Sequence, residues 1–103
     1  MAIEVIEFSQ QIRPYRLAEQ IAANALSISS NIAEGASYKS EKDFSRFLGY
    51  ALGSASELSS QLYILSHIYT KESRINAWRK KLIQIRKMLY NFRMRVDQSI
   101  LKD

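Results

Sequence analysis

Hydrophobic residues in the last third of the chain recur at alternating spacings of three and four. A stripe with this spacing keeps one side of a helix apolar over three heptads. It therefore predicts a helix over residues 74–98 that packs lengthwise on other helices. The residues of this stripe are Ile75, Trp78, Leu82, Ile85, Leu89, Phe92 and Val96.

The middle of the chain carries a second stripe of the same kind, which begins at Phe44 and ends at Tyr69. It predicts a helix over residues 41–69. Ser40, with Asp43 three residues later, is typical of a helix start, because the serine side chain can accept a hydrogen bond from a free backbone N–H of the first turn.

Two more helices are predicted before this one. Residues 15–34 form an amphipathic helix, with Pro14 at its first turn and Gly35 as a left-handed cap at its end. Residues 3–12 form a short helix. Because short loops join long helices, neighbours along the chain are expected to pack antiparallel. The sequence thus predicts one all-α domain over residues 1–103, an up-down bundle of the four-helix type with a short first helix.

The composition excludes several classes of protein. A length of 103 residues suits one domain, and a hydrophobic content of 47% supports a folded core. The absence of cysteine excludes a disulfide scaffold, a thiolate metal site and a cysteine nucleophile. No apolar run approaches the roughly 18 residues of a membrane helix, and the start of the chain does not resemble a signal peptide. We therefore expect a cytoplasmic protein without a membrane partner.

The sequence offers little for metal or cofactor chemistry. His67 is its only histidine, and neither an HExxH motif nor a glycine-rich phosphate loop occurs. We expect no metal and no cofactor, and we assign no catalytic residue.

The positive charge is concentrated at one end of the chain. The net charge is +5, but residues 74–103 contain nine basic and two acidic residues, a net charge of +7. Such asymmetry indicates an anionic partner, whereas the alternative is a solvated helix face that keeps the protein soluble. The sequence leaves both interpretations open. The residues expected to contact a nucleic acid are Arg79, Lys80, Arg86, Lys87 and Arg93.

Small and polar residues crowd the end of the second predicted helix, and the third has a similar stretch around Gly49 and Gly53. Each glycine inside a helix costs about 1 kcal/mol relative to alanine, so we expect the two helices to approach closely here. A polar network would then fix their register. Its predicted members are Asn31, Glu34, Gly35, Arg46, Ser54 and Glu57.

A carboxylate site for a metal or for catalysis is the alternative interpretation of Asn31, Glu34 and Glu57. It has little support, because the Glu-x-x-His pairs of metal sites in helical bundles are absent.

Four apolar residues of the last helix lie outside its stripe, where a single bundle would not bury all of them. We expect them to contact other subunits. They are Ile83, Met88, Tyr90 and Met94.

Two runs of the sequence resemble a known family. They are QIAANALSISSNIAEG (residues 20–35) and SEKDFSRFLGYALGSASEL (residues 40–58). The NIAEG run and the F-x-x-F-L…A-x-G-S-x-x-E-L spacing are the specific parts, and the likeness extends over residues 15–96. The chain resembles the four-helix-bundle family of 23S rRNA-intervening-sequence proteins. These are encoded within insertions in bacterial large-subunit ribosomal RNA genes and elsewhere in bacterial genomes.

The resemblance implies a helical bundle assembled into a ring-like homopentamer. The related accessory proteins of diversity-generating retroelements look like pentamers too, and they have a basic surface that binds nucleic acid and a reverse transcriptase. Family members usually begin with a long first helix, whereas only residues 3–12 precede Pro14 here. A short first helix is expected to leave a groove beside the other three helices. Either partners in the oligomer cover this groove, or the bundle is less stable than usual.

Three functions follow, in order of support. The first is a non-enzymatic oligomer that binds nucleic acid, RNA above all, by its backbone or shape through the basic last helix. The second is a protein-interaction scaffold, or an accessory subunit for a partner such as a reverse transcriptase. The third is an enzyme such as a nuclease, for which only Asn31, Glu34 and Glu57 are candidates.

Overall fold

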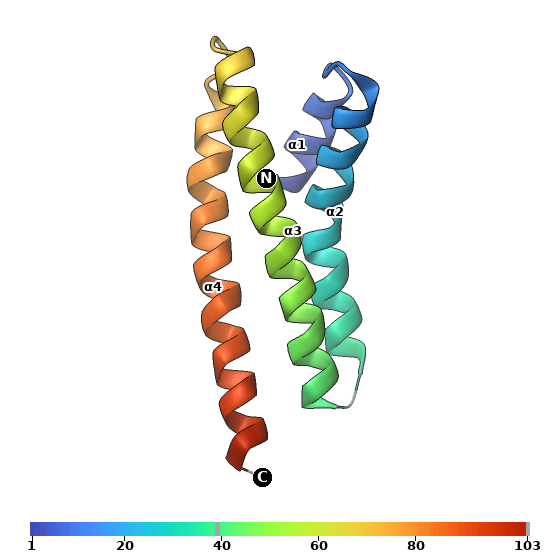
Figure 1. Cartoon of the computed structure of the whole chain (residues 1–103), viewed down its shortest axis with the longest axis vertical. Helices are drawn as coiled ribbons and strands as arrows, with labels where there is room; N and C mark the ends of the chain where they lie inside the picture. Colours follow the sequence, from blue (N-terminus) through green and yellow to red (C-terminus); the bar gives the residue numbers. More distant parts are fainter. Residues whose placement is uncertain (39, 103) are drawn as a thin grey trace.

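The computed structural model describes residues 1–38 and 40–102 as four helices joined by short connections (Figure 1). The helices are α1 (Ala2–Ser9), α2 (Tyr15–Ser37), α3 (Glu41–Ile68) and α4 (Arg74–Lys102). No strand occurs in these residues. The all-α class and the four helices predicted from the sequence are therefore confirmed.

The middle of the core is supplied by α3, which lies between α2 and α4 (Figure 1). Its buried apolar residues are those of the predicted stripe, because the spacing of three and four brings them to one side of the helix. The buried apolar residues of the three long helices are Ala18, Ile21, Ala25 and Ile28 of α2, Leu48, Ala51, Ala55, Leu58, Leu62 and Leu65 of α3, and Ile75, Trp78, Leu82 and Leu89 of α4.

The alignment of α2 and α3 follows from hydrogen bonds between them. The amide of Asn24 donates to Oε1 of Gln61 at 3.1 Å, and the hydroxyls of Ser27 and Ser54 lie 2.8 Å apart. Later residues of α2 therefore meet earlier residues of α3, as the short connection between them requires.

The end of α2 differs from the prediction. Gly35 lies inside the helix, which continues to Ser37, and no glycine in the described residues has a positive φ. The prediction of a left-handed cap at Gly35 was therefore wrong. The glycine is required for packing instead, because a Cβ atom there would lie 2.8 Å from Cβ of Phe47 and 3.0 Å from Cδ1 of Phe44. The two helices thus approach closely at this end.

The two glycines of α3 do not have the close helix contact that we expected. A Cβ atom at Gly49 would lie 2.9 Å from the guanidinium carbon of Arg93, so a side chain of α4 occupies the space. Gly53 has nothing within 4 Å of the corresponding position. The contact that the small residues predicted is therefore present at Gly35 but not at Gly53.

The start of α3 is as predicted. The backbone N–H of Asp43 donates to Oγ of Ser40 at 3.4 Å, and Glu41 and Asp43 lie in the first turn, where the helix dipole favours negative charge.

The shortest helix, α1, closes the bundle at one end only. It packs on α2, and its Phe8 ring lies 5.4 Å from the Tyr69 ring and 5.7 Å from the Trp78 ring. This is the end at which α3 is connected to α4. With eight residues, α1 is about 12 Å long, whereas the 23 residues of α2 extend over about 35 Å.

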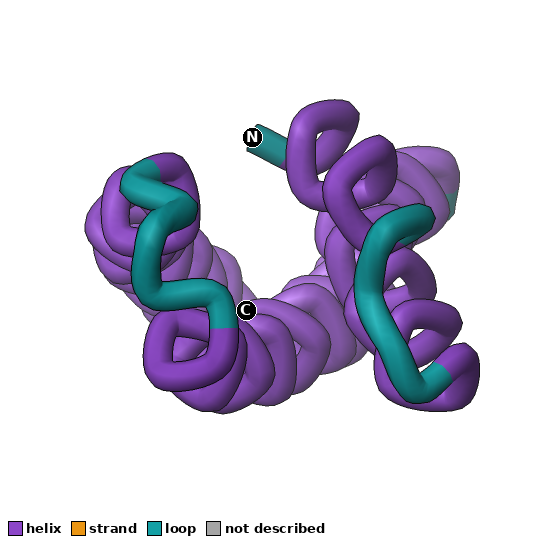
Figure 2. The backbone as a smooth tube through the Cα atoms, turned by 90° about the horizontal axis from the view of Figure 1, so that it is seen from above, coloured by secondary structure: helices purple, strands orange, loops and turns teal. Residues whose placement is uncertain are grey.

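A groove lies between α2 and α4 beyond the start of α1. Seen along the long axis of the molecule, the helices leave one side open (Figure 2). The groove has a volume of about 880 Å³ and includes Ile28 and Ile32 of α2 and Ile85 and Phe92 of α4 in its lining. The groove expected beside a short first helix is therefore present.

Within the described residues, none of the helices combines the length and the apolar character needed to cross a bilayer.

Candidate functional site

The arginines at every seventh position of α4 lie along its boundary with α3. The guanidinium carbon of Arg79 lies 5.0 Å from the centre of the Tyr63 ring, and its Nη1 donates to Oδ1 of Asn76 at 3.2 Å. Arg86 lines a hollow together with Ser56. Because α4 runs back along α3, each step of seven residues on one helix is matched by seven on the other.

Arg93 is the third of these arginines, and it is engaged in helix packing. Its guanidinium lies over Gly49, and its Nε donates to Oγ of Ser45 at 3.3 Å. The Ser45 hydroxyl in turn donates to Oδ1 of Asp97 in a short hydrogen bond. Ser45 is buried and Arg93 and Asp97 are half-buried, so this chain of contacts joins α3 to α4. Of the five basic residues predicted to bind nucleic acid, Arg93 is thus the one held within the fold.

The other four basic residues line two hollows on the outer side of the α3–α4 boundary. The larger hollow, about 550 Å³, is lined by Leu52, Ser56, Ile83, Arg86, Lys87, Tyr90 and Asn91. The smaller, about 370 Å³, is lined by Ser59, Asn76, Arg79, Lys80 and Ile83. Because Ile83 lines both, the hollows follow one another along the boundary. We call Arg79, Lys80, Arg86 and Lys87, with the hydroxyls of Ser56 and Ser59, the basic seam.

Among the described residues, no carboxylate pairs with the basic seam. Neither hollow has an acidic residue in its lining. Within residues 1–38 and 40–102, the ion pairs join the Met1 amino group to Glu4, Arg46 to Asp43 and Arg74 to Glu72. The seam therefore presents four positive charges to solvent.

Arg74, at the start of α4, differs from the seam residues because a carboxylate pairs with it. Its Nε lies 2.8 Å from Oε1 of Glu72, and Nη2 donates to Oε2 at 3.0 Å. The hydrogen bonds from Arg74 lower the pKa of the Glu72 carboxyl, and the same contact raises the pKa of Arg74. The seam residues have no partner of this kind among the described residues.

The predicted polar network between α2 and α3 is present in part. The amide of Asn31 donates to the carbonyl oxygen of Ser27 at 2.8 Å and to its Oγ at 2.7 Å, and Ser27 Oγ contacts Ser54 Oγ. Asn31 and Ser54 therefore belong to the network through Ser27. The sequence interpretation missed Ser27 as the bridge, and missed the Asn24–Gln61 pair, because both depend on the register of two helices.

The charged members of that network lie elsewhere. Arg46 pairs with Asp43 of its own helix at 3.0 Å, and Glu34 and Glu57 are exposed. Neither carboxylate forms a hydrogen bond or ion pair within the described part of the chain. This part of the network prediction was wrong, because the carboxylates point to water, where hydration replaces a protein partner.

Asn31, Glu34 and Glu57 also do not form the alternative carboxylate site. Glu34 adjoins Gly35, which contacts Phe47, so Glu57 lies ten residues further along α3, or about 15 Å. Across the described residues, no three His, Cys, Asp or Glu side chains are grouped as metal ligands would be.

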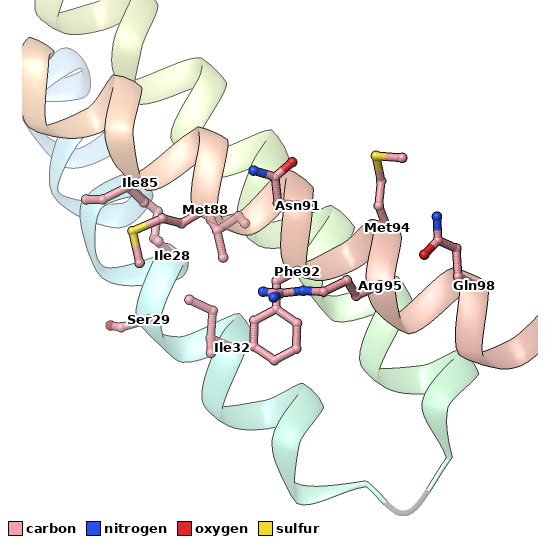
Figure 3. A pocket seen from close by; sticks show the side chains of 11 residues that line it. Ile28, Ser29, Ile32, Ile85, Met88, Asn91, Phe92, Met94, Arg95 and Gln98 are labelled. Atoms are coloured by element: carbon pink, nitrogen blue, oxygen red, sulfur yellow. The ribbon is translucent and has the colours of Figure 1, made fainter.

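The four apolar residues expected to contact other subunits lie on two sides of α4. Ile83 and Tyr90 belong to the hollows of the basic seam, whereas Met88 and Met94 line the groove between α2 and α4 (Figure 3). The groove and the larger hollow adjoin at Asn91, but neither includes all four of these residues in its lining. The periodicity placed each residue outside the core but could not tell which neighbouring helix lay on each side.

A family model described as 23S rRNA-intervening sequence protein matches residues 1–91. The chain belongs to this family. The match confirms the resemblance seen in the sequence, and it covers α1, α2, α3 and the part of α4 that carries the basic seam. No curated protein and no solved structure matches the chain. The name of the 23S rRNA-intervening sequence proteins points to a role connected with RNA.

Proposed function

We propose that this 23S rRNA-intervening sequence protein binds the phosphate backbone of structured RNA through the basic seam, without catalysing a reaction. The supporting observation is that Arg79, Lys80, Arg86 and Lys87 line two consecutive hollows in which no acidic residue takes part. Unpaired cations on one face of a helix attract phosphates because binding releases the counterions that surround nucleic acid.

The geometry of the seam suits a backbone better than a base edge. From Arg79 to Lys87 the seam extends over nine residues of α4, about 12 Å along the helix axis. The hydroxyls of Ser56 and Ser59 lie in the same hollows and can donate to phosphate oxygens. Tyr90 is the exposed aromatic residue at one end of the seam. Recognition would therefore depend on shape and charge, with little readout of sequence.

The test compares two triple variants with the same change of charge. The seam variant carries Lys80→Glu, Arg86→Glu and Lys87→Glu. The control carries Arg16→Glu, Lys42→Glu and Lys71→Glu, three exposed residues outside the seam. Fluorescence anisotropy with a labelled RNA hairpin measures affinity from about 50 to 200 mM salt, where four phosphate contacts give a slope of about −3 to −4 in log K against log salt.

We expect the seam variant to lose affinity roughly tenfold or more and the control to lose much less. A salt slope near zero for the unaltered protein would refute the proposal. Equal losses in both triple variants would also refute it, since they would reflect net charge alone.

A second candidate function, a protein-interaction scaffold, is favoured by the apolar groove between α2 and α4. Most residues that line the groove are apolar, and Met88 is 69% exposed. Retention of one protein by the chain after nuclease treatment would favour this function over RNA binding.

A further inference from the structure

The groove between α2 and α4 occupies the place of a missing helix neighbour. At the other end of the bundle, α1 covers the same side, with Phe8 against Trp78. The groove begins on α4 at Ile85, two turns beyond Trp78, and continues to Gln98. Over this length Ile28 and Ile32 of α2 and Ile85 and Phe92 of α4 line the groove. The short helix α1 lies toward the other end of the bundle and does not cover them (Figure 1).

The lining of the groove has the character of an unfinished core. Ile28 and Leu89 are buried at its floor, Ile32 and Ile85 are half-buried, and Phe92 is 40% exposed although it belongs to the predicted stripe of α4. Figure 3 shows Phe92 directed toward Ile32 across the groove. Apolar surface left in this form gains stability when a partner covers it.

The dimensions of the groove fit a helix. The 14 residues from Ile85 to Gln98 correspond to about 20 Å, which an occupant of about 14 helical residues would match. A helix lying in a groove between two others inserts apolar residues at positions i, i+4, i+7 and i+11. Met88 suits such a contact, because its unbranched side chain adapts to different partners.

The charge of the groove selects among possible helices. Among the described residues that line the groove, Arg95 is the only charged one, and its guanidinium carbon lies 5.8 Å from the centre of the Phe92 ring. The helix that forms this wall lies in the segment with a net charge of +7. A second copy of α4 would be repelled here, whereas a helix with carboxylates beside its apolar stripe would be attracted.

We propose that the groove binds an amphipathic helix of a partner protein, with acidic residues beside its apolar stripe. The groove adjoins the larger hollow of the basic seam at Asn91, which lines both, but none of the four basic residues of the seam lines the groove. The proposal therefore does not depend on RNA binding.

The probes are three labelled synthetic peptides that differ in one property each. The first has leucine at positions i, i+4, i+7 and i+11 with glutamate on both sides of this stripe. The second replaces every glutamate by lysine. The third has the composition of the first with its leucines scrambled. Fluorescence anisotropy with the full chain measures binding. We expect the acidic peptide to bind at least tenfold more tightly than the basic one, and the scrambled peptide not to bind.

Three variants of the chain locate the contact. Met88→Gln removes apolar surface without adding charge, so it should weaken the acidic peptide about tenfold. Arg95→Glu should reverse the preference between the acidic and the basic peptide. Ile83→Gln, at a residue of α4 that does not line the groove, is the control and should change nothing. Circular dichroism confirms that each variant remains helical.

Several outcomes would overturn the proposal. These are equal binding of the acidic and basic peptides, full binding by Met88→Gln, and an unchanged preference in Arg95→Glu. Light scattering tests a further outcome, the self-association of the chain. If the unaltered chain self-associates and Met88→Gln abolishes the association, a second copy covers the groove and the acidic-helix proposal is wrong.

Discussion

Three glycines lie within helices, and the surroundings of each determine what a methyl group would do there. At Gly35 the nearest atom is Cβ of Phe47, which is fixed to the backbone of α3 and cannot move aside. At Gly49 the nearest atoms belong to the guanidinium of Arg93, the far end of a flexible side chain. At Gly53 there is open space. The same residue type thus has a packing role at the first position only.

This difference predicts three distinct effects of substitution by alanine. Gly35→Ala should lower the free energy of unfolding by about 1–2 kcal/mol, because overpacking forces α2 and α3 apart. Gly53→Ala should raise it by about 0.5–1 kcal/mol through helix propensity alone. Gly49→Ala should lie between them, since Arg93 can shift. Urea denaturation followed by circular dichroism measures all three, and a stabilising Gly35→Ala would contradict the packing described here.

At the scale of the helices, the stripes of α3 and α4 were sufficient to predict the fold. Leu58 and Leu82 are fully buried where the spacing of three and four placed them. The extent of burial along α4 was not predictable, because it depends on what lies opposite. Phe92 continues the stripe of Leu82 but is 40% exposed, since α1 does not extend that far.

The candidate site was predictable in part, for a related reason. Periodicity placed Arg79 and Arg93 on the same flank of α4, and both lie along α3. It could not show that Arg93 would meet Gly49 and Ser45, because a pair of residues 48 positions apart leaves no mark in a local pattern. Glu57 was predicted to join the polar network between α2 and α3, but its side chain is exposed. Its place in the sequence next to the interface did not show which way the side chain points.

The attachment of α1 leads to a prediction that the only tryptophan of the chain can report. Trp78 is 4% exposed and lies against Phe8. Phe8→Ala removes the ring that covers it, so the tryptophan emission should shift to the red and stability should fall by about 3–5 kcal/mol. Ile3→Ala, at a residue that is 74% exposed, is the matched control on the same helix and should leave the emission unchanged. An unshifted spectrum for Phe8→Ala would mean that α1 does not cover Trp78.

At the scale of the whole molecule, the chain is longer and more open than its size requires. Its radius of gyration is 15.0 Å, whereas a compact domain of 103 residues has about 13 Å. Its dimensions of 51 × 21 × 16 Å are those of a rod. The basic seam and the groove are neighbouring surfaces along this rod, since Asn91 lines both the groove and the larger hollow of the seam.

The family resemblance makes a prediction about assembly. Five copies of the 11.9 kDa chain give a mass of about 60 kDa, which light scattering measures directly. Because we propose another occupant for the groove, Met88→Gln should leave this mass unchanged. A mass of 11.9 kDa at all concentrations would contradict the ring-like assembly.

Because α1 packs against only one end of α4, the other end of α4 should unfold first. Among the side chains of α4 that the structure describes, Leu89 is the last buried one, and the helix continues for 13 more residues with α3 beside it and no α1 on the other side. On gentle warming, amide hydrogens near the carboxyl end of α4 should exchange with deuterium well before those around Leu82. Unfolding of α4 would then spread from its carboxyl end toward Trp78.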